Sequence, residues 1–126
     1  MLKAVNPATV AKSPAYSQGI EATGFQRTLF VSGQVGAKVD GSVGQNIQEQ
    51  TIIALTNLNA VLAEGGMSSS DIAKLTIYLT DETSLPGFME AASAAVGALP
   101  PATTLLIVKA LASPALLVEI EAIAVK

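Results

Sequence analysis

The apolar residues of this 126-residue chain change their spacing along the sequence, and that change limits the folds open to it. From Asn46 to Glu64 they recur at three- and four-residue intervals, the period of an amphipathic helix, and Gly65-Gly66 supplies a stop. From Asp71 to Thr80 they alternate with polar side chains, the period of a half-exposed strand. The positions expected on the buried face of the helix are Ile47, Thr51, Ala54, Leu55, Leu58, Val61 and Leu62.

Four other segments are expected to be extended. A short piece lies near Tyr16 to Ile20, and the β-prone run Thr28 to Ser32 closes on Gly33, which predicts a turn or a bulge at that glycine. Thr103 to Lys109 is apolar on both faces, which is typical of a central or interfacial strand. Leu116 to Val125 predicts the last strand.

A second helix is expected after Ser84, which can act as its cap, with Pro86 tolerated in the first turn. Gly97 and Pro100-Pro101 end it. Helices placed between runs of strands predict an α+β fold, with both helices packed on one face of a sheet and one domain over residues 1–126. The residues expected on the buried face of this helix are Phe88, Met89, Ala92, Ala95 and Val96.

Composition excludes several classes of function. A net charge of -3 and few aromatic residues argue against nucleic-acid binding, and the absence of His and Cys excludes imidazole bases, thiol nucleophiles, disulfides and ordinary zinc sites. Only 13% of the residues are charged, which favours an oligomer with large subunit interfaces.

The start of the chain has no signal-like apolar run. Pro114 and the charges around it argue against a membrane span in Leu105 to Val125, so a cytoplasmic protein is expected.

Two carboxylates stand out in the last strand. Glu119 and Glu121 are two residues apart and therefore point to the same side of an otherwise apolar strand. Such carboxylates need partners or solvent, because burying an unpaired one costs several kcal/mol or shifts its pKa. Taken alone, the strand favours a solvent-facing side or a pairing across a subunit boundary over catalysis.

Two polar clusters could line a ligand site. Ser32-Gly33-Gln34 ends the second strand with a glycine that lets backbone approach a ligand, although the motif taken alone favours a simple bulge. Tyr16-Ser17-Gln18 offers a phenol that could stack on a small ligand, and its alternative is an ordinary edge strand.

Taken together, these segments resemble the RidA family, also called the YjgF family, of enamine and imine deaminases. The resemblance covers nearly the whole chain and depends on the order and spacing of several short motifs. These are Pro14 with Tyr16-Ser17-Gln18, Phe30-Val31-Ser32-Gly33-Gln34, Gln50-Thr51 with Leu55, Asn57 and Leu58, Gly66, Asp71-Ile72 with Lys74 to Leu79, Pro101-Ala102, and Val118 to Val125.

The resemblance implies a chorismate-mutase-like fold of the bacillus type, and a homotrimer with a central barrel and small-molecule clefts between subunits. It also implies that an enamine tautomerises to an imine, which water then hydrolyses to ammonia and a 2-oxo acid without any cofactor or metal. In that scheme Glu119 holds and deprotonates the water. Tyr16, Ser32 and Gly33 line the cleft, and the backbone carbonyl near Leu105 helps to place the water. No nucleic-acid or membrane partner is implied.

Two positions depart from the archetypal members of the family. Thr103 stands where they carry an arginine that clamps the substrate carboxylate, and Met89 stands where they carry an asparagine. Losing a bidentate charged pair should weaken the binding of a 2-imino acid by about two to four powers of ten. The one arginine of the chain, Arg27, lies before a strand, and Lys109 lies at the far end of the Thr103 strand, so neither is an obvious replacement.

These departures leave two functions open. The first is a hydrolytic deaminase that accepts a neutral or differently anchored enamine, imine or related C–N substrate. The second is a trimeric small-molecule-binding or protein-interaction module that has kept the fold and lost the reaction. The persistence of Glu119 in an apolar strand favours the first. Nucleic-acid cleavage is disfavoured by the acidic balance and the missing histidine.

Overall fold

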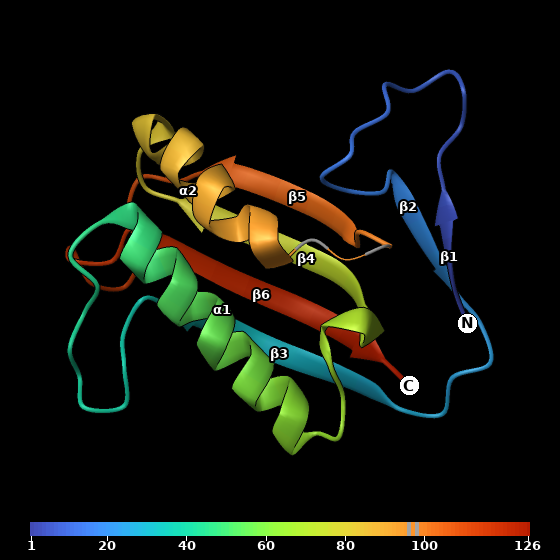
Figure 1. Cartoon of the computed structure of the whole chain (residues 1–126), viewed down its shortest axis with the longest axis horizontal. Helices are drawn as coiled ribbons and strands as arrows, with labels where there is room; N and C mark the ends of the chain where they lie inside the picture. Colours follow the sequence, from blue (N-terminus) through green and yellow to red (C-terminus); the bar gives the residue numbers. More distant parts are fainter. Residues whose placement is uncertain (96, 98) are drawn as a thin grey trace.

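The computed structural model describes residues 1–95, 97 and 99–126. Its centre is a four-stranded sheet in the order β3-β6-β4-β5 (Figure 1). β6 (Val118–Val125) pairs antiparallel with β3 (Thr28–Val35) on one side and with β4 (Ile72–Leu79) on the other, and β5 (Ala102–Ile107) pairs parallel with β4. The α+β fold with a mixed sheet is therefore confirmed.

Both helices cover the same face of this sheet (Figure 1). α1 (Ile47–Glu64) and α2 (Leu85–Ala92) pack on each other and over the strands. The other face is open, since no helix of the described residues lies over it (Figure 1). The core between the helices and the sheet includes Ala54, Leu58, Leu62, Ile77, Leu79, Phe88, Val118 and Ile120.

Two further strands form a separate antiparallel pair beside the sheet (Figure 1). They are β1 (Leu2–Val5) and β2 (Gly19–Ala22), so the extended piece expected near Tyr16 begins later than predicted. Ser17 makes an isolated parallel bridge to Ala102, which joins this N-terminal segment to the start of β5.

The first helix and the strand after it match their predictions. Asn46 caps α1, since its side chain accepts the Glu49 N–H, and Gly66 follows the helix with a φ of 70°, a conformation that glycine adopts without penalty. The buried face of α1 differs from the predicted one at two positions. Val61 is exposed, whereas Gln50 is buried because its amide finds backbone partners.

The second helix differs at its start. Ser84 makes no side-chain cap bond. A 3-10 turn, Glu82–Ser84, precedes α2 instead, and Asp81 caps that turn by accepting the Thr83 N–H. A second such turn, Ser69–Asp71, leads into β4, and a third, Ser93–Ala95, follows α2.

The buried face predicted for this second helix is only partly right. Phe88 is buried and Ala92 is partly buried against the core. Met89 is 44% exposed and Ala95 is exposed, because α2 is short and contacts the core through one narrow stripe. Val96, expected on the same face, lies outside the described residues.

The remaining strands shift by a few residues. β3 continues past Gly33 to Val35, and its register with β6 shifts between Val31 and Gln34, which confirms a bulge there. β5 is an edge strand of the described sheet, so of the two positions predicted for Thr103–Lys109 the central one is wrong for the single chain, and the interfacial one stays a prediction. Its apolar outer residues are instead exposed, with Leu106 and Ile107 each 47% accessible. Among the described residues, no helix is long and apolar enough to span a bilayer.

The two helix starts offer a matched test of stability. Asn46→Ala removes a formed cap bond and should lower the free energy of unfolding by about 1 kcal/mol. Ser84→Ala removes no cap bond and should change it by less than about 0.5 kcal/mol. Urea denaturation of both variants measures the difference, and equal losses would contradict this assignment of the caps.

Candidate functional site

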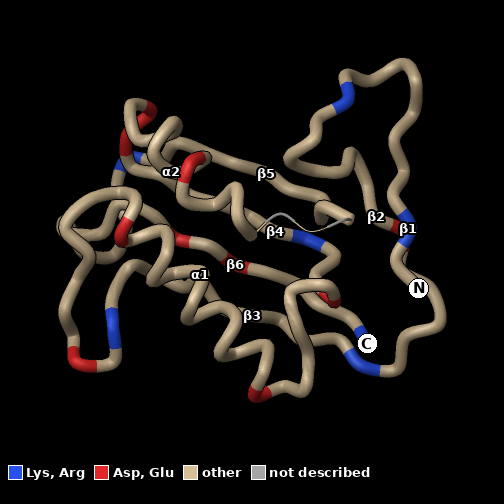
Figure 2. Tube along the Cα trace, in the orientation of Figure 1, with Lys and Arg blue, Asp and Glu red and all other residues tan. Residues whose placement is uncertain are grey.

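The two carboxylates predicted to share a side do so, on the open face of the sheet. β6 alternates between buried residues, such as Val118 and Ile120, and the half-buried Glu119 and Glu121. Two acidic segments are visible along this strand in Figure 2. Because β6 lies between β3 and β4, side chains from both neighbouring strands surround these carboxylates.

Gly33 and Glu119 lie in direct contact. The bulge of β3 turns the Gly33 backbone toward the Glu119 side chain. A Cβ added at Gly33 would overlap the carboxylate oxygen Oε1 of Glu119 and lie 2.6 Å from its Cδ. The absence of a side chain at Gly33 therefore lets the Glu119 carboxylate approach the backbone closely, whereas the sequence predicted that a ligand would approach there. Ser32 lies exposed on the same bulge, next to Gly33.

Glu121 is paired with a tyrosine, Tyr78, that was not among the predicted site residues. The Tyr78 hydroxyl donates to Glu121 Oε1 at 2.8 Å, and Tyr78 lies directly opposite Glu119 across the β4–β6 ladder. The pKa of Tyr78 is raised above its ordinary value, chiefly by this hydrogen bond, then by desolvation and by the charges of Glu121 and Glu119. Tyr78 is consequently a neutral donor at physiological pH.

A cleft of about 370 Å³ contains both carboxylates. One side is formed by strand residues and the other by the loop after β5. No Lys or Arg lines this cleft among the described residues. Glu121 therefore shares the cleft with Glu119, a point that the sequence left open. The lining residues are Tyr78, Val108, Ala110, Leu111, Ala112, Glu119 and Glu121.

Sequence patterns identified only part of this cleft. Tyr78 occupies a polar-face position of an alternating strand, so the pattern could have placed it beside the carboxylates once the pairing of β4 with β6 was known. The loop wall from Val108 to Ala112 carries no periodicity or motif that would have revealed it.

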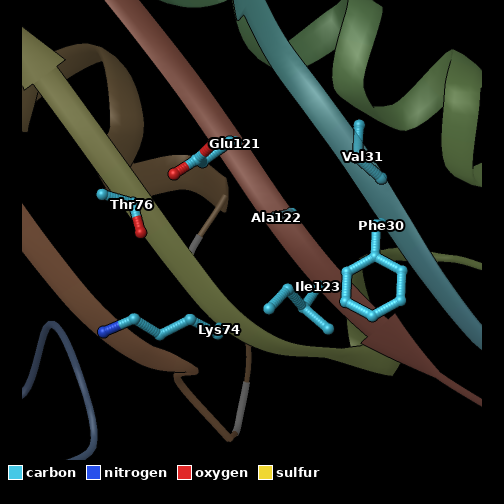
Figure 3. A pocket seen from close by; sticks show the side chains of 7 residues that line it. All are labelled: Phe30, Val31, Lys74, Thr76, Glu121, Ala122 and Ile123. Atoms are coloured by element: carbon cyan, nitrogen blue, oxygen red, sulfur yellow. The ribbon is translucent and has the colours of Figure 1, made fainter.

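A smaller depression of about 180 Å³ lies further along the same face. Glu121 and Thr76 project toward each other across neighbouring strands, while Phe30 and Ile123 lie together at the other end (Figure 3). Lys74 points away toward β5, where its Nζ donates to Thr104 Oγ1 at 2.8 Å. Glu121 is thus shared between this depression and the Glu119 cleft.

Thr103 and Leu105, two of the predicted ligand-binding residues, lie on the other face of the sheet. Thr103 pairs with Leu75, and Leu105 pairs with Ile77; both partners pack toward the core beneath the helices. The Thr103 hydroxyl donates to the Pro101 carbonyl at 3.1 Å. Within one chain, the side chains of Thr103 and Leu105 therefore face away from Glu119, and the backbone carbonyl near Leu105 belongs to β5, which β4 separates from β6.

Tyr16 and Met89 also lie away from Glu119. Tyr16 precedes Ser17, which bridges to Ala102, at the level of Lys74 on β4. Glu119 lies at the level of Tyr78, about 13 Å further along that strand. Met89 belongs to α2, which covers the opposite face. The chain thus places Gly33 against Glu119, with Ser32 next to Gly33 along the strand, but neither Ser32 nor Gly33 lines the 370 Å³ cleft, and Tyr16, Met89, Thr103 and Leu105 lie elsewhere.

Among the described residues, no group of three or more His, Cys, Asp or Glu side chains is arranged to hold a metal ion. Glu119 and Glu121 form only a pair, and Tyr78 already occupies one Glu121 oxygen.

Comparison with known proteins assigns the family. The family model described as Endoribonuclease L-PSP matches residues 7–126. A RutC family protein of Pyrococcus abyssi is 36% identical over 115 residues, which is 88% of this chain and 86% of the relative. The chain belongs to the RidA family. The resemblance seen in the sequence is thereby confirmed.

Solved structures of the RidA family share the fold described above. The Rid family protein YyfB of Yersinia pestis superposes with a TM-score of 0.88 at 33% identity, covering 99% of this chain and 98% of its own. Escherichia coli TdcF with bound serine has a TM-score of 0.75 at 28% identity, covering 96% of this chain and 93% of its own. TdcF is named as a candidate reactive intermediate deaminase, and is 31% identical over 67 residues, 52% of this chain and 50% of TdcF.

The Tyr78–Glu121 pair predicts a measurable alkaline titration. In a Tyr16→Phe background Tyr78 is the remaining one of two tyrosines, and its tyrosinate absorbance should appear above pH 10.0. Adding Glu121→Gln removes the charge and should lower the midpoint toward that value. Because the pKa is raised in the folded chain, the stability contributed by neutral Tyr78 is fully present below pH 10 and is lost as pH rises through the folded pKa.

The control for this titration is Glu64→Gln, which removes an equal charge at the end of α1. It should leave the Tyr78 midpoint unchanged. Coincident curves for the Glu121→Gln and Glu64→Gln variants would show that the Glu121 contact does not exist in solution.

Proposed function

We propose that this RidA-family protein is a hydrolytic deaminase of a small reactive enamine, imine or related C–N compound. The observation that carries the proposal is the contact between Glu119 and Gly33, in which a carboxylate that also lines the cleft lies against a side-chain-free backbone. A carboxylate held in this position can accept a proton from a water molecule during the reaction. The name of TdcF supports the same class of reaction.

In the proposed reaction the enamine first tautomerises to its imine. Glu119 accepts a proton from a water molecule, and the water oxygen bonds to the imine carbon while the C=N electron pair moves to nitrogen, which takes up a proton. The resulting carbinolamine collapses to a carbonyl and releases ammonia. The net change is the addition of one water and the loss of one ammonia, so no oxidant or reductant is needed.

We further propose that the complete cleft forms between subunits of a homotrimer with a central barrel. Thr103 and Leu105 lie on the opposite face from Glu119, so a ligand that meets all three must lie between two chains. The open sheet face offers a surface for such packing, because Phe30 is 73% exposed there. Tyr16 and Met89 would then join Glu119 from a neighbouring copy.

The substrate is proposed to differ from a 2-imino acid. Thr103 has no cationic group, and the described lining of the Glu119 cleft contains two carboxylates but no Lys or Arg. A substrate carboxylate would meet like charges there, whereas a neutral or positively charged imine would not. The same lack of cations disfavours RNA cleavage, despite the description of the family model.

The second candidate function is a non-catalytic trimeric module that binds a small molecule or a protein. It is favoured by Thr103, whose hydroxyl is engaged with the Pro101 carbonyl rather than turned to a ligand. The two experiments below separate this candidate from the enzyme.

The first experiment replaces the proposed base. Glu119→Gln keeps the size of the side chain but cannot accept the proton, so turnover should fall by about 100-fold or more. An enamine or imine is generated in situ by a coupled enzyme, and carbonyl product formation is followed. Glu64→Gln is the charge-matched control and should keep full activity. Both variants should show a trimer mass by light scattering. Full activity of Glu119→Gln would contradict the assignment of Glu119 as the general base.

The second experiment tests substrate charge. Thr103→Arg supplies the missing cation, and with a 2-aminoacrylate-type enamine the variant should form 2-oxo acid at least about tenfold faster than wild type. Activity gained only by the variant indicates a competent site with a different native substrate. No activity in either protein, with this and with uncharged imines, would favour the binding module.

A further inference from the structure

Gln50, in the first turn of α1, is a buried polar side chain at the meeting point of three segments. It is 1% exposed. Its Nε2 donates to the carbonyls of Gly44 and Ala115, each at 2.9 Å, and its Oε1 accepts from the Leu117 N–H at 2.8 Å. Both amide hydrogens and the amide oxygen are therefore used. Removing the amide would leave two carbonyls and one N–H without these partners.

Two of these bonds, those to Ala115 and Leu117, hold the segment that contains the loop wall of the Glu119 cleft. This segment runs from Val108 to Leu117 without regular secondary structure. At its start the Val108 N–H donates to the Leu79 carbonyl at 2.8 Å, and at its end the Leu117 carbonyl accepts from the Thr80 N–H at 3.2 Å. Gln50 adds the bonds at Ala115 and Leu117, immediately before β6 brings Glu119 into the cleft.

The other side of Gln50 is packed against the segment that follows β3. A Cβ added at Gly36 would lie 2.5 Å from Gln50 Cγ, and one added at Gly44 would lie 2.9 Å from the same atom. Gly36 is separated by only two residues from Gly33, whose backbone touches the Glu119 side chain. Gln50 thus lies between the two stretches of chain that supply the contacting pair, Gly33 and Glu119.

We propose that Gln50 is a positioning residue for the Glu119 cleft. Its amide fixes the end of the Val108–Leu117 segment and the start of β6 relative to the turn after β3. It thereby sets where the Glu119 carboxylate lies over Gly33. The inference rests on the proposed function of Glu119. Since small displacements of a reacting group cost large factors in rate, the effect of losing the amide should appear in kcat more than in KM.

The test compares variants that separate positioning from simple stability. Gln50→Met keeps the length of the side chain and removes all three bonds, and Gln50→Glu keeps the acceptor but lacks the two amide hydrogens. Thr51→Val is the adjacent control, because Thr51 is 0% exposed and its hydroxyl has no hydrogen-bond partner among the described residues, so no such bond is lost. Leu62→Ala is the stability control, since Leu62 is 0% exposed at the far end of α1.

Turnover of the same in situ generated substrate is measured well below the melting temperature of every variant. Gln50→Met and Gln50→Glu should lose about 10- to 100-fold in kcat with KM changed less than about threefold, whereas Thr51→Val and Leu62→Ala should keep kcat. A kcat loss of the same size in Leu62→Ala would show that Gln50 acts only through global stability, and would overturn the inference.

A second measurement needs no ligand. The backbone amide resonances of Gly33 and Glu119 should shift in Gln50→Met and stay in place in Leu62→Ala and Thr51→Val. Unshifted resonances in Gln50→Met would overturn the inference whatever the turnover assay gives. If the Gly33 and Glu119 resonances shift in Gln50→Met while Glu119→Gln keeps full activity, the positioning role of Gln50 is supported. The proposed catalytic role of Glu119 is then the claim that is contradicted.

Discussion

The pairing of β6 with a strand on each side is the constraint on which the rest of the structure depends. One side of β6 supplies Val118 and Ile120 to the core, and the other side presents Glu119 and Glu121. A register slip of one residue would turn both carboxylates under the helices, where they would be buried without partners. The register that closes the core is therefore also the register that creates the candidate site.

Much of this arrangement could be predicted from the sequence, because it depends on local periodicity. The spacing of apolar residues gave α1 and β4 to within a residue or two, and the two-residue separation of Glu119 and Glu121 gave their common face. The glycine at the end of the β-prone run correctly indicated a bulge at Gly33. Each of these inferences needs only neighbours along the chain.

The features that sequence reasoning missed depend on partners distant along the chain. Gln50 is buried with its amide bonded to the backbone of the remote residues Ala115 and Leu117, and Tyr78 joins the site because β4 lies beside β6. Thr103 was expected to share a cleft between subunits with Glu119, and the parallel pairing of β5 with β4 turns it to the opposite face of its own chain. The family resemblance pointed to Thr103 and Glu119 as site residues, but it did not show that they lie on opposite faces of the sheet within one chain.

The position of β5 has a consequence for the behaviour of an isolated chain. On its outer side, within the described part of the chain, β5 is bridged only at Ala102, by Ser17 of the N-terminal segment. The rest of that edge exposes apolar side chains, Leu106 and Ile107 among them, and such an edge can template strand addition by other molecules. A substitution that loosens the N-terminal segment could therefore leave the core intact and still promote aggregation.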